Sequence, residues 1–135
     1  MSYGSDLYTQ LSGYTALTSL VGSRIYPRQV KQATGTPYLV LEKVSDIPIY
    51  SHQGYSHLRR MRQQVSVYAS SDTEAEAVVA QVKAAMEAWP AANSSVQMCL
   101  MLDDYGLLDE EAANPDGSGL ALYHNPVDFT IHYAD

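Results

Sequence analysis

The spacing of apolar residues near the start of the chain is the feature that most limits what it can fold into. Ser5 is a suitable N-terminal cap, Asp6 suits the positive end of a helix dipole, and Gly22 is suited to the C-terminal cap. Between them, large side chains recur at intervals of three and four: Leu7, Leu11, Tyr14, Leu17 and Val21. This period predicts one amphipathic helix.

Strand-like patterns follow this helix. Residues 24–26 form a short extended piece that Pro27 stops, and residues 38–44 are apolar on two faces. Residues 61–69 alternate, and one face of that strand holds Met61, Gln63, Val65, Val67 and Ala69. The stretch between the two strands, residues 47–58, is polar and rich in turn formers, so we expect a long loop there.

A second helix and two further strands complete the pattern. Residues 71–74 form a capping box that opens a helix, and Trp89-Pro90 is expected to end it. Residues 95–103 and 120–133 then predict two strands. Because proline cannot donate to a strand ladder, Pro126 predicts an interruption at an edge strand or a bulge.

This order of elements predicts an α+β fold. We expect an antiparallel sheet of about four to five strands with two helices packed on one face. A chain of 135 residues suits one domain, residues 1–135, which should bury roughly two-thirds of the surface that its unfolded form exposes.

Composition narrows the classes of function. A net charge of −7 argues against a groove that binds duplex DNA, because such binding depends on Lys and Arg neutralising phosphates. Eleven Tyr residues against one Phe and one Trp favour interfaces over a plain core. The start of the chain lacks a basic segment and a long apolar run, so we expect no targeting leader, no membrane contact and a protein made in a cytoplasm.

The titratable residues do not form a recognisable catalytic or metal-binding motif. The histidine pairs His52/His57 and His124/His132 lack the helical spacing of metal ligands, and Cys99 is alone in an apolar run. The acidic residues of segment 103–116 do not match a calcium-binding loop, and no nucleophile or phosphate-binding motif is found. We therefore expect no catalytic residue, no metal and no cofactor.

Two segments are candidates for contact surfaces instead. The first is the 47–58 stretch with the basic strand after it, and its residues are Tyr50, His52, Tyr55, His57, Arg59, Arg60 and Arg62. It is suited either to single-stranded nucleic acid or, in better agreement with the net charge, to an acidic neighbour. The second is an acidic hairpin loop whose carboxylates are Asp103, Asp104, Asp109, Glu110, Glu111 and Asp116. We expect it to be mobile, because so many charges are costly to bury.

A series of short motifs in the first two-thirds of the chain has the order of a known family. These are residues 20–22, residues 24–27, residues 37–40, the Gly54 loop, the set Arg62, Gln64, Val65, Val67 and Tyr68, and the 74–86 helix. Over residues 5–90 the chain resembles the tail-completion (tail-terminator) proteins of long-tailed, siphovirus-type bacteriophages and prophages. The specificity lies in the order of the motifs, because each of them is short.

The resemblance implies a structural subunit of the virion, at the interface of head and tail, assembled in the host bacterial cytoplasm. It implies a homo-oligomeric ring, commonly a hexamer, that caps the tail-tube protein and meets the head-completion or connector protein. DNA would pass through the lumen without specific binding, and the acidic loop would face the lumen or one end of the ring. The alternatives are another connector or minor tail protein, or a small enzyme.

Overall fold

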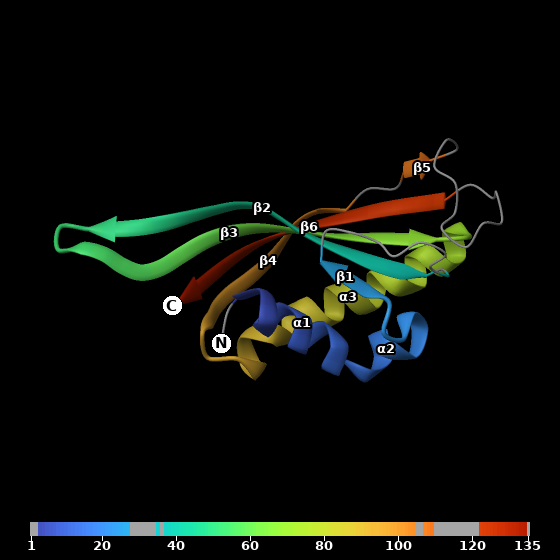
Figure 1. Ribbon diagram of the computed structural model, residues 1–135, viewed down its shortest axis with the longest axis horizontal. Coiled ribbons are helices and arrows are strands. Elements are labelled where there is room, and N and C mark those ends of the chain that lie inside the picture. Colours follow the sequence, from blue (N-terminus) through green and yellow to red (C-terminus); the bar gives the residue numbers. More distant parts are fainter. Residues whose placement is uncertain (1–2, 28–34, 36, 105–106, 110–121, 135) are drawn as a thin grey trace.

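The computed structural model describes residues 3–27, 35, 37–104, 107–109 and 122–134 of the chain. Three helices and six strands make up the described part (Figure 1). In chain order they are α1 (Tyr3–Gly13), α2 (Thr15–Val21), β1 (Ile25–Pro27), β2 (Tyr38–Ser51), β3 (Gly54–Ala69), α3 (Asp72–Ala92), β4 (Val96–Asp104), β5 (Leu107–Asp109) and β6 (Leu122–Ala134).

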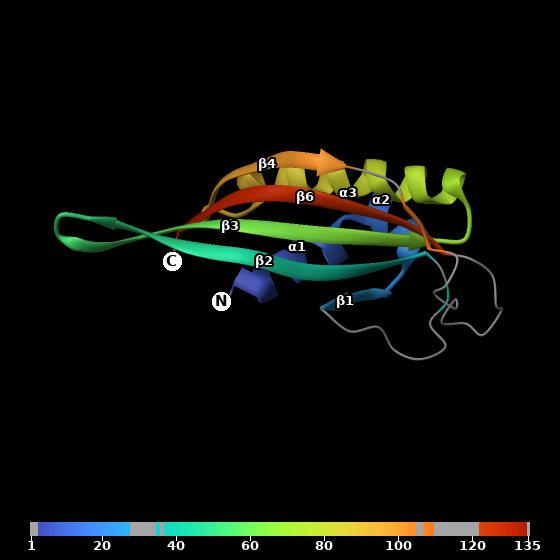
Figure 2. The same ribbon diagram turned by 90° about the horizontal axis from the view of Figure 1, so that it is seen from above.

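The strands form one sheet in the order β1-β2-β3-β6-β4, and β5 also pairs with β6 (Figure 2). Every pair is antiparallel except β1 with β2, which is parallel. The α+β class is therefore confirmed, but the sheet is mixed where a purely antiparallel one was predicted. Strand β1 is too short for the sequence pattern to give its direction.

The helices lie together on one side of the sheet (Figure 1). The predicted inward face of β3 is confirmed, because Met61, Val65 and Val67 are fully buried under these helices. Trp89 of α3 and Phe129 of β6 are the largest fully buried side chains in this core. Within the described residues, no helix is long and apolar enough to cross a membrane.

The helix boundaries differ from the prediction in three places. The single helix predicted at the start of the chain is divided into two helices, α1 and α2, because Tyr14 between them adopts an extended conformation (φ −87°, ψ 100°). Ser5 lies inside α1 and does not cap it. Helix α3 continues past Pro90 to Ala92, since a proline near the end of a helix removes few hydrogen bonds.

The N-terminal end of α3 follows the predicted capping box. The backbone N–H of Glu74 donates to Ser71 Oγ at 3.2 Å. The Glu74 carboxylate reaches back and accepts from the backbone N–H of Ser70, also at 3.2 Å. Two backbone groups at the start of the helix are thereby satisfied.

The prediction of a long loop at residues 47–58 is wrong. Strands β2 and β3 continue through it as a hairpin that turns at residues 52–53. Polar composition concealed the strand pattern, which Ile47, Ile49, Tyr50 and Tyr55 support with β-branched and aromatic side chains. Pro48 is tolerated because β1 pairs only with residues 39–41, so among the described strands β2 is outermost at that point.

The predicted interruption at Asn125-Pro126 is also wrong. Strand β6 runs through both residues and lies between β3 and β4, in the interior of the sheet. Pro126 lies opposite Ser66 of β3. On the other edge of β6, Val127 pairs with Asp104 of β4 and His124 pairs with Leu107 of β5, and Pro126 lies between these two pairs. The proline thus occupies the point where β6 changes partner from β4 to β5.

Candidate assembly surfaces

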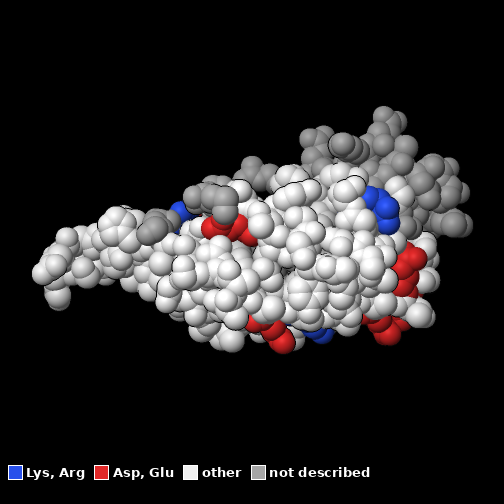
Figure 3. Space-filling model, turned by 90° about the horizontal axis from the view of Figure 1, so that it is seen from below, with Lys and Arg blue, Asp and Glu red and all other residues white. Residues whose placement is uncertain are grey.

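The hairpin of β2 and β3 extends beyond the body of the molecule (Figure 1). The first residue of β3 along the chain that pairs with β6 is Leu58, opposite Ala134. Residues 49–57 therefore pair only within the hairpin, and we call them the arm. Residues 47–58 contain no Asp, Glu, Lys or Arg. On the face shown in Figure 3, the projection accordingly shows neither the blue of Lys and Arg nor the red of Asp and Glu. An uncharged, tyrosine-bearing projection has the composition of an interface.

Three rings cluster near the tip of the arm. Tyr50 and Tyr55 lie opposite each other in the register, with ring centroids 5.7 Å apart. The ring of Tyr55 is in turn 4.8 Å from that of His57. Tyr50 is 69% exposed, so the cluster presents aromatic surface to solvent. His52 lies at the turn and is exposed.

A bulge shapes this end of the hairpin. Ile49 pairs with Leu58 while Tyr50 pairs with Tyr55, so β3 has two extra residues at this point that pair with no residue of β2. One of them, His57, has a positive φ of 64°. The other, Ser56, donates its hydroxyl to the carbonyl oxygen of Ile49 at 2.6 Å. The bulge turns the His57 ring toward Tyr55.

Ion pairs hold the base of the arm. Asp46 of β2 accepts two hydrogen bonds from the guanidinium of Arg59, one of them from Nε at 2.9 Å, and one from Lys43 Nζ at 3.1 Å. The Arg59 hydrogen bond is the main reason that the pKa of Asp46 lies below its ordinary value, with a smaller contribution from Lys43. The Asp46 side chain is only 17% exposed, so water screens these contacts less than on an open surface.

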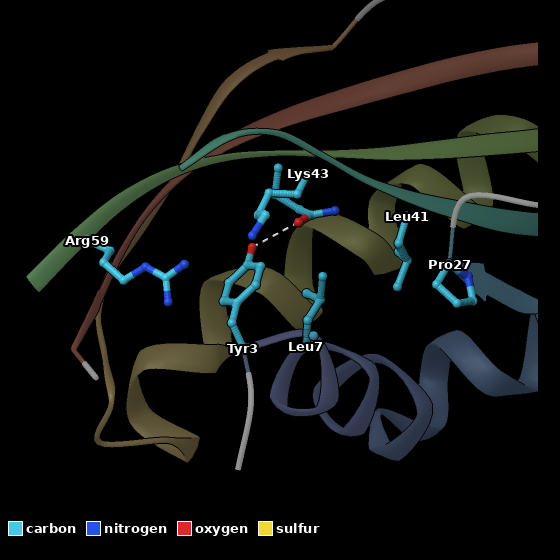
Figure 4. Close-up of a pocket in the computed structure, with 8 residues that line it drawn as sticks. Tyr3, Leu7, Pro27, Leu41, Lys43 and Arg59 are labelled. Carbon is cyan, nitrogen blue, oxygen red and sulfur yellow. Dashed lines mark hydrogen bonds between the residues drawn. The ribbon is translucent and has the colours of Figure 1, made fainter. Parts of the chain in front are cut away.

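A cavity of about 390 Å³ opens beside these ion pairs on the helix side of the sheet (Figure 4). Leu7, Pro27 and Leu41 form its apolar wall, and Lys43 and Arg59 supply cations. At its end the Tyr3 hydroxyl donates to Gln63 Oε1 at 2.9 Å. Burial raises the pKa of Tyr3, so this hydroxyl stays protonated.

The predicted basic patch does not form one surface. Arg59 faces the helix side, with Gln63 and Met61. Arg60 and Arg62 face the opposite side of the sheet, because successive residues of a strand alternate. Arg62 pairs with Asp128 of β6 at 2.9 Å, and Arg60 is exposed. Arg59 and Arg62 are thus engaged in ion pairs with Asp46 and Asp128. Of the three arginines, Arg60 could contact a partner without breaking either of these two ion pairs.

The tyrosines divide between core and surface. Tyr3, Tyr38 and Tyr133 are buried, while Tyr8 and Tyr50 are exposed. A row of rings on the helix-free face joins Tyr38, Tyr68 and His124, stacked at 5.0 Å and 4.3 Å. Burial, with a smaller effect of Tyr68, raises the pKa of Tyr38 to about 12. The excess of tyrosine therefore serves the sheet as well as the surface.

Part of the predicted acidic loop lies in strands. Asp103 and Asp104 are in β4, and Asp109 is in β5. Asp103 is exposed and lies opposite Asp128. Glu110, Glu111 and Asp116 are outside the described residues. Among the residues that are described, no three His, Cys, Asp or Glu side chains gather as a metal site would need.

The sequence did not show that several exposed apolar residues lie on the two outer strands of the sheet. Val44 and Ile47 on β2 are exposed, as are Leu100, Met101 and Leu102 on β4. The run of residues 100–102 could have been noticed as three adjacent large apolar side chains. The sequence predicts a strand at residues 95–103 but does not say that this strand lies at the edge of the sheet.

Comparison with solved structures shows where a similar fold occurs. The chain is similar to a chain of the virion of a native gene transfer agent particle, with a TM-score of 0.70 and 16% identity over 99% of this chain and 96% of that one. No curated protein sequence matches the chain. At this level of identity the similarity establishes the fold alone.

The family follows from the sequence. The model of the family described as tail completion protein gp17 matches residues 5–131. The chain therefore belongs to this family and is a structural protein of a phage tail. The predicted resemblance is confirmed, and it extends beyond residues 5–90 into β6.

Proposed function

We propose that this protein is a tail terminator, which forms a ring of six copies on the end of the tail tube. The family match over residues 5–131 is the observation that carries the proposal. The physical features agree with it, since a small subunit with an uncharged projecting arm and two apolar outer strands is built to be covered by neighbours. Residues 1–135 act as one structural domain with no catalytic role.

The ring has two partners in this proposal. The tail-tube protein contacts one face and the head-completion or connector protein contacts the other, and DNA passes through the lumen. A chain with a net charge of −7 favours passage over retention, because it repels phosphate. The carboxylates of segment 103–116 face the lumen or one end of the ring. Assembly takes place in the cytoplasm of the host bacterium.

Electron microscopy of the purified protein mixed with tail tubes tests the ring. We expect capped tubes with a rotationally symmetric density at one end. Free protein can be a monomer until it meets the tube, so light scattering of the free protein is recorded beside the micrographs. Density without rotational symmetry would contradict the ring. Binding to head connectors but not to tubes would favour the second candidate, a head-completion protein.

The arm and Arg60 are proposed to lie at a subunit or tube contact with an acidic surface. Replacing Arg60 with Glu should reduce the capping of tubes, and the loss should grow as salt is lowered because like charges are then less screened. The neutral variant Arg60→Gln is the matched control and should show a smaller, salt-insensitive loss. Wild-type capping by both variants would remove Arg60 from the contact.

Passage of DNA is tested by a binding measurement. The purified protein should show no measurable affinity for duplex DNA at physiological salt. Tight binding that weakens steeply with salt would contradict a repulsive lumen and would favour a nucleic-acid-binding role for the basic strand.

A further inference from the structure

The exposed apolar side chains of this protein are concentrated on the two outer strands of the sheet. Eight large apolar residues are exposed among the residues described, and six of them lie on β2 or β4. They are Val44, Ile47 and Tyr50 on β2, and Leu100, Met101 and Leu102 on β4. The other two, Tyr8 and Leu20, lie on helices. Apolar side chains on open strand edges are a hazard unless a partner covers them.

The two edges are at opposite ends of the sheet and are matched in direction. Strand β4 is the last strand on one side, and β2 beyond Leu41 is the outermost described strand on the other. Successive antiparallel pairings from β2 through β3 and β6 make β4 antiparallel to β2 within one chain. A second copy placed edge to edge in the same orientation therefore presents its β2 antiparallel to β4 of the first.

The faces of the two strands also agree. Ile47 lies opposite Arg60 in β3, and Leu100 lies opposite Thr130 in β6. Arg60 and Thr130 are each followed by a residue that is buried on the helix side, Met61 and Ile131. The side chains of Ile47 and Leu100 are therefore on the helix-free face of the sheet. In a sheet continued across two copies, Ile47 and Leu100 would be on the same surface.

We propose that the outer edge of β4 in one copy binds the outer edge of β2 in the next copy, so that the sheet continues around the ring. This proposal rests on the proposed ring and names the contact that closes it. An antiparallel register with Ile47 opposite Leu100 places these two exposed apolar side chains side by side on the helix-free face of the continued sheet. Two different edges meet head to tail, which is the kind of interface that makes a ring.

Cysteine pairing tests this contact in the assembled particle. The double variant Ile47→Cys/Leu100→Cys, assembled on tail tubes and oxidised, should give a ladder of disulfide-linked products up to the full ring. Each single variant alone should give none, and a mixture of the two single variants should stop at dimers. The native Cys99 is only 8% exposed, and the wild-type chain is the control for its reaction.

The outcomes separate the contact from the ring. Symmetric caps without cross-linked product in the double variant would overturn this proposal and leave the tail terminator intact. Disulfide dimers of the Leu100→Cys variant alone would overturn it too, because they would show two identical edges in contact. Tubes that the wild-type protein does not cap with a ring would overturn the proposed function itself.

A substitution series gives an independent readout. Leu100→Asp on β4 and Ile47→Asp on β2 should each reduce the fraction of capped tubes about tenfold or more, because an unpaired charge would be buried in the contact. Leu20→Asp, at the exposed apolar residue of α2, is the matched control and should cap normally. Circular dichroism checks that each variant is folded. Normal capping by folded Leu100→Asp and Ile47→Asp would contradict the proposal.

Discussion

Tyr133 donates a hydrogen bond from its hydroxyl to Oδ2 of Asp6, and this bond joins the last strand to the first helix. Both side chains are buried, and the Tyr3 ring packs edge-on against that of Tyr133 at 5.3 Å. The Asp6 carboxylate therefore depends on Tyr133 for a partner inside the protein. Residues 127 positions apart in the chain are fixed together by one polar contact.

Replacing Tyr133 with Phe tests the strength of this contact. We expect a loss of about 2 kcal/mol in the free energy of unfolding, because the buried carboxylate loses a hydrogen-bond partner while the ring packing is kept. Tyr8→Phe, at a tyrosine that is 42% exposed, is the matched control and should change stability little. Urea unfolding measures both. Equal stability of the wild type and Tyr133→Phe would show that the bond contributes nothing net.

The ion pairs at the base of the arm predict a pH dependence. The pKa of Asp46 is lowered in the folded protein, mainly by Arg59, so the stabilisation is fully present above the unfolded pKa of about 3.9. It is lost as pH falls through the lower folded pKa. The wild type should therefore be more stable than Asp46→Asn at pH 6, and the difference should shrink in acid. Thermal unfolding from pH 2 to 6 measures it, and a constant difference would contradict this account.

His57 should be sensitive to substitution because of its positive φ of 64°. His57→Val should destabilise the arm by roughly 1–2 kcal/mol, since a β-branched residue is strained in this region, whereas His57→Gly should be tolerated. Hydrogen exchange of the arm amides is the right measurement, because a projecting hairpin can open without global unfolding. Exchange that is equally fast in the two variants would show that the bulge relaxes without strain.

Cys99 should be a poor nucleophile in the folded protein. Burial, with a smaller effect of Glu87, raises the pKa of its thiol to about 12, so very little thiolate is present at pH 8. We expect thiol reagents to modify Cys99 slowly in buffer and rapidly in denaturant. Fast labelling of the native protein would mean that β4 is open at its edge.

The sequence by itself determined the class of fold and the inner faces of its elements. The alternation of residues 61–69 predicted which side of β3 is buried, and the capping box predicted where α3 begins. These are local properties, because the period of side chains and the chemistry of a helix end depend on near neighbours in the chain. The order of such motifs was also enough to predict the family.

Only the tertiary structure decided what lies at the edges and beyond the body. Residues 47–58 looked like a loop because their polar side chains hide a hairpin that is exposed on both faces. Leu100 belongs to an apolar strand, and it is 52% exposed because that strand lies at the end of the sheet. Arg59 and Arg60 looked like one patch but point to opposite faces. Strand order and pairing are long-range properties, and no local pattern in the chain encodes which strand lies outermost.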